Sequence, residues 1–399
     1  MPRRAPSLRG PFGALLLCAA CAPGPTAAPD AAVADASGDG AMRDAGPSEG
    51  GIPSDAGGSD ASPSDAGVAG GPVLLSLNLH CLDQSGTPYV DPAARLGAIA
   101  AAAVAEGADL IAVQEACDDG VLDALALLEQ GLEEASGTAW SSAWAFAHLA
   151  WEGTAEEARE GVGLLARGAL GETRSIEHHV QGALTRVALA AEIPAHPELR
   201  LVVVHLDHLD ETVRTAQARE AAAAALAWSD PSLTVVVAGD LNARAGTAPH
   251  AAFVAAGFRD ASRALPADRI DHVFVHRGAG LEVRDARLRF DGPGEAVSDH
   301  PGVLVGLFPA APEATVVTRI TARVDVGFGH FVAIRGDRAP LDWVTGWPLL
   351  DVAADEWRFV GTELDGAFEY KVLLDDATWQ VGPNEMGAAG EDLSVVPVF

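Results

Sequence analysis

Short apolar runs alternate with longer alanine-rich stretches through the central part of the chain. Apolar runs of about four to eight residues that end in polar groups are typical of buried strands, whereas alanine-rich stretches favour helices. The pattern therefore predicts a layered α/β fold in which groups of strands are separated by helices. The predicted strands are 73–79, 110–113, 144–151, 162–166, 183–191, 199–205, one ending at Asp240, 271–276, 282–289 and 303–307, and the predicted helices are 95–106, 121–134 and 211–228.

The composition changes around the proline-containing stretch 309–312. Residues 313–399 alternate apolar with polar positions, as in 315–322, and carry no strong helix signal. This length and pattern predict a small all-β sandwich of the immunoglobulin-like kind. We therefore expect two folded domains, at 73–308 and 313–399.

The segment that precedes the first predicted strand has a different character. Residues 22–72 are almost entirely Ala, Asp, Gly, Ser and Pro, a composition that buries too little apolar surface to offset the entropy of ordering. It predicts a disordered acidic tether.

The first 21 residues resemble a targeting segment. Arg3, Arg4 and Arg9 are followed by an apolar stretch that ends in small residues before Cys21, as in a bacterial lipoprotein signal peptide. Lipidation of Cys21 would anchor an extracytoplasmic protein to the membrane through acyl chains. The alternative is secretion after cleavage near residues 27–28.

Charge and cysteine content narrow the function further. The chain has 56 acidic and 26 basic residues and a formal net charge of −30, which disfavours non-specific binding to nucleic acid. It also contains no GxGxxG or Walker motif. In an oxidising compartment Cys81 and Cys117 are candidates for a disulfide, and a buried pair of free thiols is the alternative.

Polar residues with catalytic potential lie at the ends of several predicted strands. Asp240 and Asn242 directly follow an apolar run, Glu115 follows another, Asp271 begins a third, and the pair Asp299–His300 precedes a fourth. Carboxylates, a carboxamide and an imidazole at neighbouring strand ends favour one metal-assisted site.

The motifs that hold these residues resemble those of the endonuclease/exonuclease/phosphatase superfamily. In chain order they are Ser76-Leu77-Asn78, Val113-Gln114-Glu115, Glu160-Gly161-Val162-Gly163, Val204-His205-Leu206, Gly239-Asp240-Leu241-Asn242, Arg269-Ile270-Asp271 and Ser298-Asp299-His300. Val204 stands where the family motif has Thr. The resemblance covers residues 73–308 and implies a DNase I-like α/β/β/α sandwich of four layers.

Functional roles are implied by the same resemblance. Asn78, Glu115 and Asp299 would hold a divalent cation, Mg²⁺ first and Mn²⁺ or Ca²⁺ as alternatives. The catalytic residues would be His205, Asp240, Asn242, Asp271 and His300. They would orient and deprotonate water, stabilise the phosphoryl group and protonate the leaving oxygen.

The C-terminal region contains, in this order, Phe331-Val332-Ala333-Ile334-Arg335-Gly336, Leu341-Asp342-Trp343, Phe368-Glu369-Tyr370-Lys371 and Trp379-Gln380-Val381-Gly382-Pro383-Asn384. The order of these motifs resembles that of a starch-binding-type carbohydrate-binding module. By that resemblance Trp343 and Trp379 would stack on sugar rings, with Lys371 and Asn384 binding hydroxyl groups. The alternative is that the tryptophans belong to the core of the sandwich.

Together these features predict a monomeric, exported, membrane-tethered metal-dependent phosphoesterase that hydrolyses phosphodiesters. Its substrate would be a phospholipid head group, extracellular DNA, or a sugar or inositol phosphate, and a polysaccharide is a candidate second ligand. The alternative is a glycan-binding surface lipoprotein with a catalytically silent phosphoesterase fold.

Overall fold

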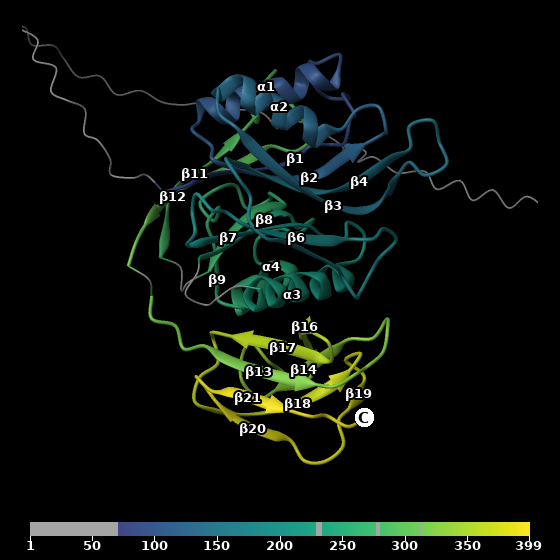
Figure 1. The fold of residues 1–399 in the computed structure, drawn as a ribbon, viewed down its shortest axis with the longest axis vertical. Helices are drawn as coiled ribbons and strands as arrows, with labels where there is room; N and C mark the ends of the chain where they lie inside the picture. Colours follow the sequence, from purple (N-terminus) through teal and green to yellow (C-terminus); the bar gives the residue numbers. More distant parts are fainter. Residues whose placement is uncertain (1–70, 229–233, 277–279, 312) are drawn as a thin grey trace, which may run out of the picture. The chain divides into compact units, whose positions relative to one another are not determined.

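The computed structural model describes residues 71–228, 234–276, 280–311 and 313–399 (Figure 1). The predicted signal peptide with Cys21, and the predicted tether up to residue 70, lie outside the described residues. Within the described part of the chain, no helix is both long and apolar enough to cross a membrane.

The first sheet has the strand order β11-β12-β1-β2-β4-β3. The pair β1–β2 is parallel and the other pairs are antiparallel. Its strands are β1 (Val73–Asn78), β2 (Leu110–Asp118), β3 (Trp140–Ala150), β4 (Ala158–Arg167), β11 (Leu281–Arg289) and β12 (Gly302–Pro309).

The second sheet repeats this plan with the order β5-β6-β7-β8-β10-β9. Here β7–β8 is the parallel pair, and the others are antiparallel. Its strands are β5 (Thr173–Glu177), β6 (Val187–Glu192), β7 (Leu199–His205), β8 (Thr234–Asp240), β9 (Phe258–Asp260) and β10 (Asp271–His276).

Helices cover the outer faces of the two sheets (Figure 1). Helices α1 (Pro92–Ala105) and α2 (Ala124–Ser136) share a core with the first sheet, and α3 (Glu211–Ala227) and α4 (Ala248–Ala255) share one with the second. A third core, which includes Leu164 of β4 and Val236 of β8, fills the space between the sheets. The four-layer α/β/β/α sandwich expected from the sequence is thereby confirmed.

Aspartates fix the starting points of three helices. The side chains of Asp91, Asp123 and Asp210 each accept a hydrogen bond from a backbone N–H in the first turn of α1, α2 and α3. Such N-caps satisfy donors that have no partner within the helix and stabilise it by about 1 kcal/mol.

The elements missed by the sequence pattern are the edge strand β5, the short helix α4 and the three-residue strand β9. Strand β5 has the mixed sequence Thr-Arg-Ser-Ile-Glu and is mostly exposed, so it gives no apolar run. Helix α4 has eight residues, fewer than periodicity needs to stand out. The expected strand 110–113 extends to Asp118, so Glu115 lies within β2 and not beyond it.

Residues 313–399 form two sheets of their own, with no helix among the described residues. The all-β character is confirmed, whereas the immunoglobulin-like assignment remains a prediction. The strands are β13 (Thr318–Arg323), β14 (Val332–Gly336), β15 (Trp347–Pro348), β16 (Leu350–Ala353), β17 (Glu356–Gly361), β18 (Ala367–Leu374), β19 (Thr378–Trp379), β20 (Glu385–Ala388) and β21 (Asp392–Val395).

Candidate active site

The predicted site residues meet where the parallel strand pairs of both sheets end. Asn78 is the last residue of β1, and His205 and Asp240 are the last residues of β7 and β8, where they pair directly. Asp271, the first residue of β10, pairs with Asp240 from the other side. The carboxyl ends of β1, β7 and β8, the start of β10 and the irregular part of β2 that carries Glu115 therefore deliver polar groups to one place between the sheets.

Asn78 joins the two sheets at this place. Its Nδ2 donates to Glu115 Oε1 at 2.9 Å and to Asp240 Oδ2 at 3.2 Å, while its Oδ1 accepts from the His80 backbone N–H at 2.9 Å. The carboxamide is fully buried. In this arrangement Asn78 holds two carboxylates together through its amino group.

His300 and Asp271 form the predicted pair. His300 Nδ1 lies 2.8 Å from Asp271 Oδ2 and 3.8 Å from Asp240 Oδ2. Burial alone would lower the pKa of His300, but the hydrogen bond to Asp271 and the charges of Asp240, Asp271 and Asp299 raise it to about 10. The imidazole is therefore a protonated donor at neutral pH.

Carboxylates crowd the centre of the site. Burial and the charge of Glu160 raise the pKa of Glu115 to about 7, against the hydrogen bond from Asn78. Burial and the charge of Asp271 raise the pKa of Asp240 to about 6, against the charge of His300. Close like charges away from water cannot all ionise at low cost, and a cation would relieve this repulsion.

Asn242 and its loop are held in a defined backbone conformation. Asn242 has φ of 50°, a left-handed conformation that asparagine tolerates better than most residues. Its N–H donates to Asp240 Oδ1 at 2.7 Å, and its Nδ2 donates to the Leu206 carbonyl at 3.1 Å. A Cβ at Gly239 would lie 1.9 Å from the Val204 carbonyl oxygen, so this position requires glycine.

Arg186, which the sequence analysis did not predict as a site residue, holds His205 in place. Its Nδ1 lies 3.0 Å from Arg186 Nη1, and its Nε2 lies 3.6 Å from Asp240 Oδ2. Burial and the charge of Arg186 keep the pKa of His205 well below its usual value. Because the guanidinium can only donate, Nδ1 is the acceptor of a neutral ring and Nε2 carries the hydrogen.

Three residues of the site were missed by the sequence analysis: Arg186, Glu160 and His148. Glu160 Oε1 lies 3.5 Å from Arg186 Nη1 and 3.5 Å from His148 Nε2. Glu160 belongs to one of the family motifs, but the sequence assigned it no role. Arg186 interrupts the apolar strand predicted at 183–191, and a charged residue there could have marked it as a site residue.

Asp299 stands apart from the other predicted metal ligands. Its carboxylate accepts from Ser298 Oγ at 3.2 Å, lies 3.8 Å from His80 Nδ1, and is about half exposed. Its charge contributes to the raised pKa of Glu115 and His300, so it belongs to the same electrostatic cluster.

The profile of the Endonuclease/Exonuclease/phosphatase family matches residues 75–300, more than half of the 399-residue chain. This chain belongs to the endonuclease/exonuclease/phosphatase family. The match includes every residue of the site described above. Membership supports a hydrolase that acts on a phosphoester. The match does not extend to the C-terminal β-strands.

Solved structures of similar fold include an endonuclease/exonuclease/phosphatase family protein from Leptotrichia buccalis C-1013-b. It is 18% identical with a TM-score of 0.49, covering 59% of this chain and 99% of that one. One from Beutenbergia cavernae DSM 12333 is 18% identical with a TM-score of 0.48, covering 79% and 99%. A mannosyl-6-phosphatase from Bacteroides thetaiotaomicron VPI-5482 is 17% identical with a TM-score of 0.45, covering 59% and 99%. No curated protein matches the chain.

Enzymes of the endonuclease/exonuclease/phosphatase family generally depend on a divalent metal, and the residues present here fit one. Ligand atoms of Asp240, Asp271 and His300 lie within 4.8 Å of one another, and the two carboxylates are the members of this group that can bind a cation, because His300 is protonated. Asp271 Oδ1 is a buried acceptor without a hydrogen-bond partner. Oxygen-rich, strongly acidic surroundings of this kind suit Mg²⁺, Mn²⁺ or Ca²⁺.

The acidic cluster predicts how stability depends on pH and metal. The pKa values of Glu115 and Asp240 are raised in the folded protein, so the native state binds more protons than the unfolded state. These two groups therefore contribute less stability as the pH rises from 4.5 to 7, whereas His205, whose pKa is lowered, contributes more as the pH rises toward 6.5. The net fall in stability of the metal-free protein should come above pH 6.5, as His300 loses its proton toward pH 10.

Scanning calorimetry in EDTA and in Mg²⁺ tests this expectation. We expect the Tm in EDTA to drop by several degrees from pH 5.5 to 8.5. Mg²⁺ should raise the Tm more at pH 8.5 than at 5.5, where it must displace protons. A Tm in EDTA that rises through this range would contradict the assignment.

A disulfide fastens the two segments that carry Asn78 and Glu115. Cys81 and Cys117 are bonded, with their Cα atoms 4.9 Å apart, and both are buried. The Cys81 N–H also donates to the Glu115 carbonyl at 3.1 Å. The disulfide alternative from the sequence is thereby confirmed.

Replacing both cysteines should weaken the fold and the metal site together. We expect the Cys81→Ser/Cys117→Ser variant to lose about 4 kcal/mol of unfolding free energy, because the disulfide closes a loop of intermediate length. Its affinity for Mg²⁺ should fall by about tenfold through looser positioning of Glu115. Denaturant titration and Mg²⁺ titration at 15 °C measure the two effects. An unchanged Mg²⁺ affinity would show that the disulfide does not help to position the metal ligands.

Of the residues expected to bind carbohydrate, Lys371 lies in β18 and Trp379 in β19, whereas Trp343 and Asn384 lie in the connecting loops. The rings of Trp343 and Trp379 are 6.2 Å apart at 38° and are 37% and 41% exposed, so neither belongs to the core. Lys371 donates to the Gly382 carbonyl and Asn384 to Glu369. Trp357 is buried, as expected for a core residue.

Proposed function

We propose that this protein is a Mg²⁺-dependent phosphodiesterase exported by its N-terminal segment. One observation carries the proposal: Asn78 holds Glu115 and Asp240 together next to the His300–Asp271 pair. This geometry gathers a cation site, a base and an acid within one buried cluster.

Asp240 is suited to orient the attacking water and to take its proton. Its pKa of about 6 lies near the working pH, which is the condition for an effective general base. One Nδ2 hydrogen of Asn242 bonds to the Leu206 carbonyl oxygen, so its other amide hydrogen can bond to a phosphoryl oxygen.

His300 and His205 are suited to donate hydrogen bonds. Asp271 holds Nδ1 of His300, so the protonated ring offers Nε2–H to a phosphoryl or leaving oxygen. His205 is neutral and also offers Nε2–H, since Arg186 fixes its other nitrogen. The surroundings of His300 and Asp240 therefore separate their pKa values, which suits His300 to act as the acid and Asp240 as the base.

A divalent cation held by Glu115, with Asn78 and Asp299 as the further predicted ligands, would stabilise the negative charge that develops on the phosphoryl group. In this assignment Asn78 would turn its carboxamide oxygen toward the cation and give up a donor contact.

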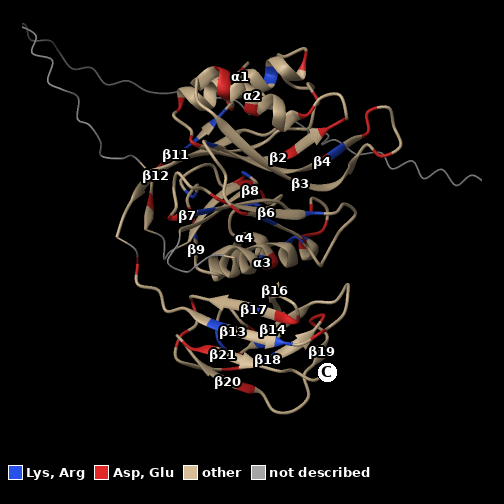
Figure 2. Cartoon of the chain, viewed as in Figure 1, with Lys and Arg blue, Asp and Glu red and all other residues tan. Residues whose placement is uncertain are grey.

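The substrate is best sought among small phosphodiesters. Acidic residues outnumber basic ones in the chain, and Figure 2 shows acidic positions on both the α/β and the all-β parts. Such a surface repels DNA unless salt screens it. Phospholipid head groups and sugar or inositol phosphates therefore rank above extracellular DNA.

Hydrolysis of bis(p-nitrophenyl) phosphate by the purified protein, with Mg²⁺, Mn²⁺ or EDTA, tests the proposal. We expect turnover with Mg²⁺ or Mn²⁺ that EDTA abolishes, and slower turnover of p-nitrophenyl phosphate. Turnover of the monoester alone would identify a phosphatase, and no turnover of either ester would favour the silent-fold alternative.

The proposal extends to membrane anchoring through Cys21. Its support is the order of basic, apolar and small residues before that cysteine. Export also agrees with a disulfide between Cys81 and Cys117. A Cys21→Ser variant that still partitions into the detergent phase after export would overturn the anchor.

A second function, glycan binding, is favoured by the exposed Trp343–Trp379 pair. Adjacent indole faces at the surface suit the apolar faces of sugar rings, and Arg335 lies 5.3 Å from the Trp379 ring.

Replacing this pair tests glycan binding directly. We expect Trp343→Ala and Trp379→Ala each to weaken sedimentation with insoluble starch by about tenfold, because each removes one stacking face. Trp151→Ala, which removes a similarly exposed tryptophan from the α/β part, should leave it unchanged. A parent protein that never sediments with starch would remove starch as the ligand.

A further inference from the structure

A cavity of about 410 Å³ lies among helix α4, strand β9 and the loop 261–270. It is within the size range of pockets that hold small molecules. The catalytic residues Asp240, Asn242 and His300 are not among those that line it. The cavity is therefore separate from the candidate active site.

Basic side chains dominate the polar lining of this cavity. Arg259, Arg263, Arg269 and His250 line it, in a chain whose net charge is −30. Arg263 is exposed and makes no ion pair with any described residue. Arg259 pairs with Glu313 at 3.0 Å, a surface contact weak enough to yield to a ligand.

The single carboxylate that lines the cavity is already neutralised. Asp260 accepts from Arg269 Nη2 at 2.5 Å, from Ser262 N–H at 2.8 Å and from Ser262 Oγ at 2.6 Å. Although burial opposes it, the hydrogen bonds from His250, His272 and Ser262 and the charge of Arg269 hold the pKa of Asp260 well below its usual value. An entering anion would therefore meet the charge of Arg263, which has no ion-pair partner among the described residues, and no carboxylate free to repel it.

A metal ion is the competing occupant, because ligand atoms of His250, Asp260 and His272 lie within 4.8 Å of one another. However, the Arg269 guanidinium touches Asp260 and lies 3.4 Å from His272 Nδ1. A fixed positive charge inside the ligand cluster opposes a cation. The charges that line the cavity therefore favour an anion over a metal cation as its ligand.

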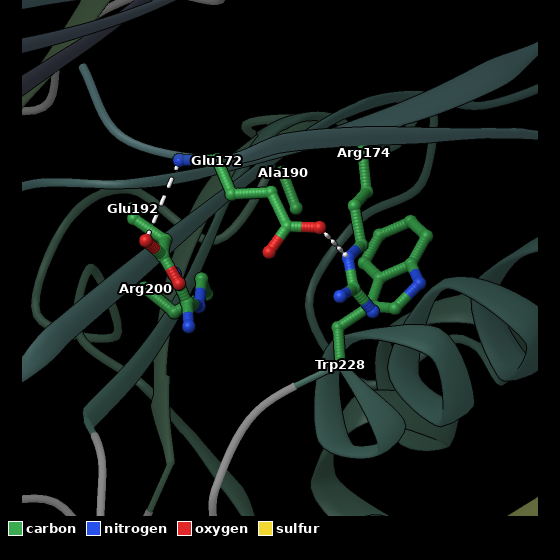
Figure 3. Close-up of a pocket in the computed structure, with 6 residues that line it drawn as sticks. All are labelled: Glu172, Arg174, Ala190, Glu192, Arg200 and Trp228. Atoms are coloured by element: carbon green, nitrogen blue, oxygen red, sulfur yellow. Dashed lines mark hydrogen bonds and ion pairs between the residues drawn. The ribbon is translucent and has the colours of Figure 1, made fainter. Parts of the chain in front are cut away.

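The remaining wall is apolar. Val254, Phe258, Ala245 and Ala267 complete the lining. By contrast, a smaller cavity of about 70 Å³ near Trp228 is lined by Glu172 and Glu192, which pair with Arg174 at 2.8 Å and Arg200 at 2.7 Å (Figure 3). That cavity balances its own charges and leaves none for a ligand.

We propose that the cavity beside α4 binds a small organic anion. Its charged oxygens pair with Arg263 and Arg259, and its apolar body packs against Val254, Ala245 and Ala267, which are exposed in the cavity wall. The class comprises carboxylates and phosphonate-like groups on a ring-sized apolar body. The proposal is independent of phosphoester hydrolysis.

Calorimetric titration of the purified protein with phenylphosphonate, benzoate and uncharged benzyl alcohol tests the proposal. Metal is first removed with EDTA and the EDTA is then dialysed away, so that neither metal at the catalytic residues nor the polycarboxylate itself competes for the probe. We expect saturable binding of at least one of the two anions and none of the alcohol. No saturable binding of either anion up to 10 mM would overturn the proposal.

Charge variants locate the binding. Arg263→Gln should weaken the anion's affinity about tenfold, and Arg338→Gln, which changes another exposed arginine in the turn after β14, should not. Val254 is 37% exposed on α4, and both Val254→Lys and Val254→Glu remove its apolar contact, so the Lys variant should bind the anion more tightly than the Glu variant through charge alone. Equal affinities in the Lys and Glu variants, or no effect of Arg263→Gln, would place the probe elsewhere and overturn the proposal.

Discussion

We expect a His300→Ala variant to hydrolyse phosphodiesters about a thousandfold more slowly than the parent protein at pH 7, with Mg²⁺ in excess. His300 holds a proton next to Asp271 and Asp240, and general acids of this kind contribute about 10²- to 10⁴-fold. The loss should fall on kcat, because the hydrogen bond matters most when charge develops on the phosphoryl or leaving oxygen.

Matched variants separate this role from a structural one. His300→Gln keeps a neutral donor and should recover part of the rate. His196→Ala removes a histidine that lies before β7 and pairs with Glu198, far along that strand from His205, and should retain full activity. Steady-state kinetics of the three variants decide the point: a His300→Ala rate within tenfold of the parent would exclude His300 as the acid.

The sequence was sufficient to predict those site residues that end an apolar strand. Asp240 and Asn242 place polar groups at the end of a buried apolar run. Burying such groups costs free energy, so their presence there indicates a functional site. Parallel pairing of β7 with β8 then brings His205 directly beside Asp240. Strand ends are properties that local sequence encodes, whereas the pairing of β7 with β8 comes from the structure.

Arg186 and Glu160 show what local sequence does not encode. Each lies within or beside a strand, and each is buried because the partner arrives from a distant segment. Their function depends on the packing of one sheet on the other, which no periodicity reveals. The same holds for Asn78, which was expected to offer its oxygen to a cation and instead donates to two carboxylates from different sheets.

The C-terminal part shows the same division. Alternation predicted strands, and the structure contains them. Alternation could not predict whether Trp343 and Trp379 are core or surface residues. Both lie in or next to turns, where the direction of a side chain depends on the fold and not on the alternating pattern. Their exposure in the structure places both at the surface, while the ligand remains a proposal.

The second large effect is expected from Glu115→Gln, which should abolish Mg²⁺-dependent turnover, with a loss of about a thousandfold or more. The carboxylate is the central predicted ligand, and a metal contributes several kcal/mol of charge stabilisation, each 1.4 kcal/mol being about tenfold in rate. Gln keeps the shape and the hydrogen bond to Asn78 but removes the charge.

Stability distinguishes a lost ligand from a damaged fold. Glu115 has its pKa raised to about 7 by burial and by Glu160, so its ionised form is costly in the metal-free protein at pH 8.5. Glu115→Gln should therefore raise the Tm in EDTA at pH 8.5 while abolishing the further rise that Mg²⁺ gives the parent. Glu152→Gln, at an exposed position, is the matched control and should change neither. A Glu115→Gln protein that keeps Mg²⁺-dependent turnover within tenfold of the parent would refute this carboxylate as a ligand, and one with a lowered Tm in EDTA would show that its charge supports the fold.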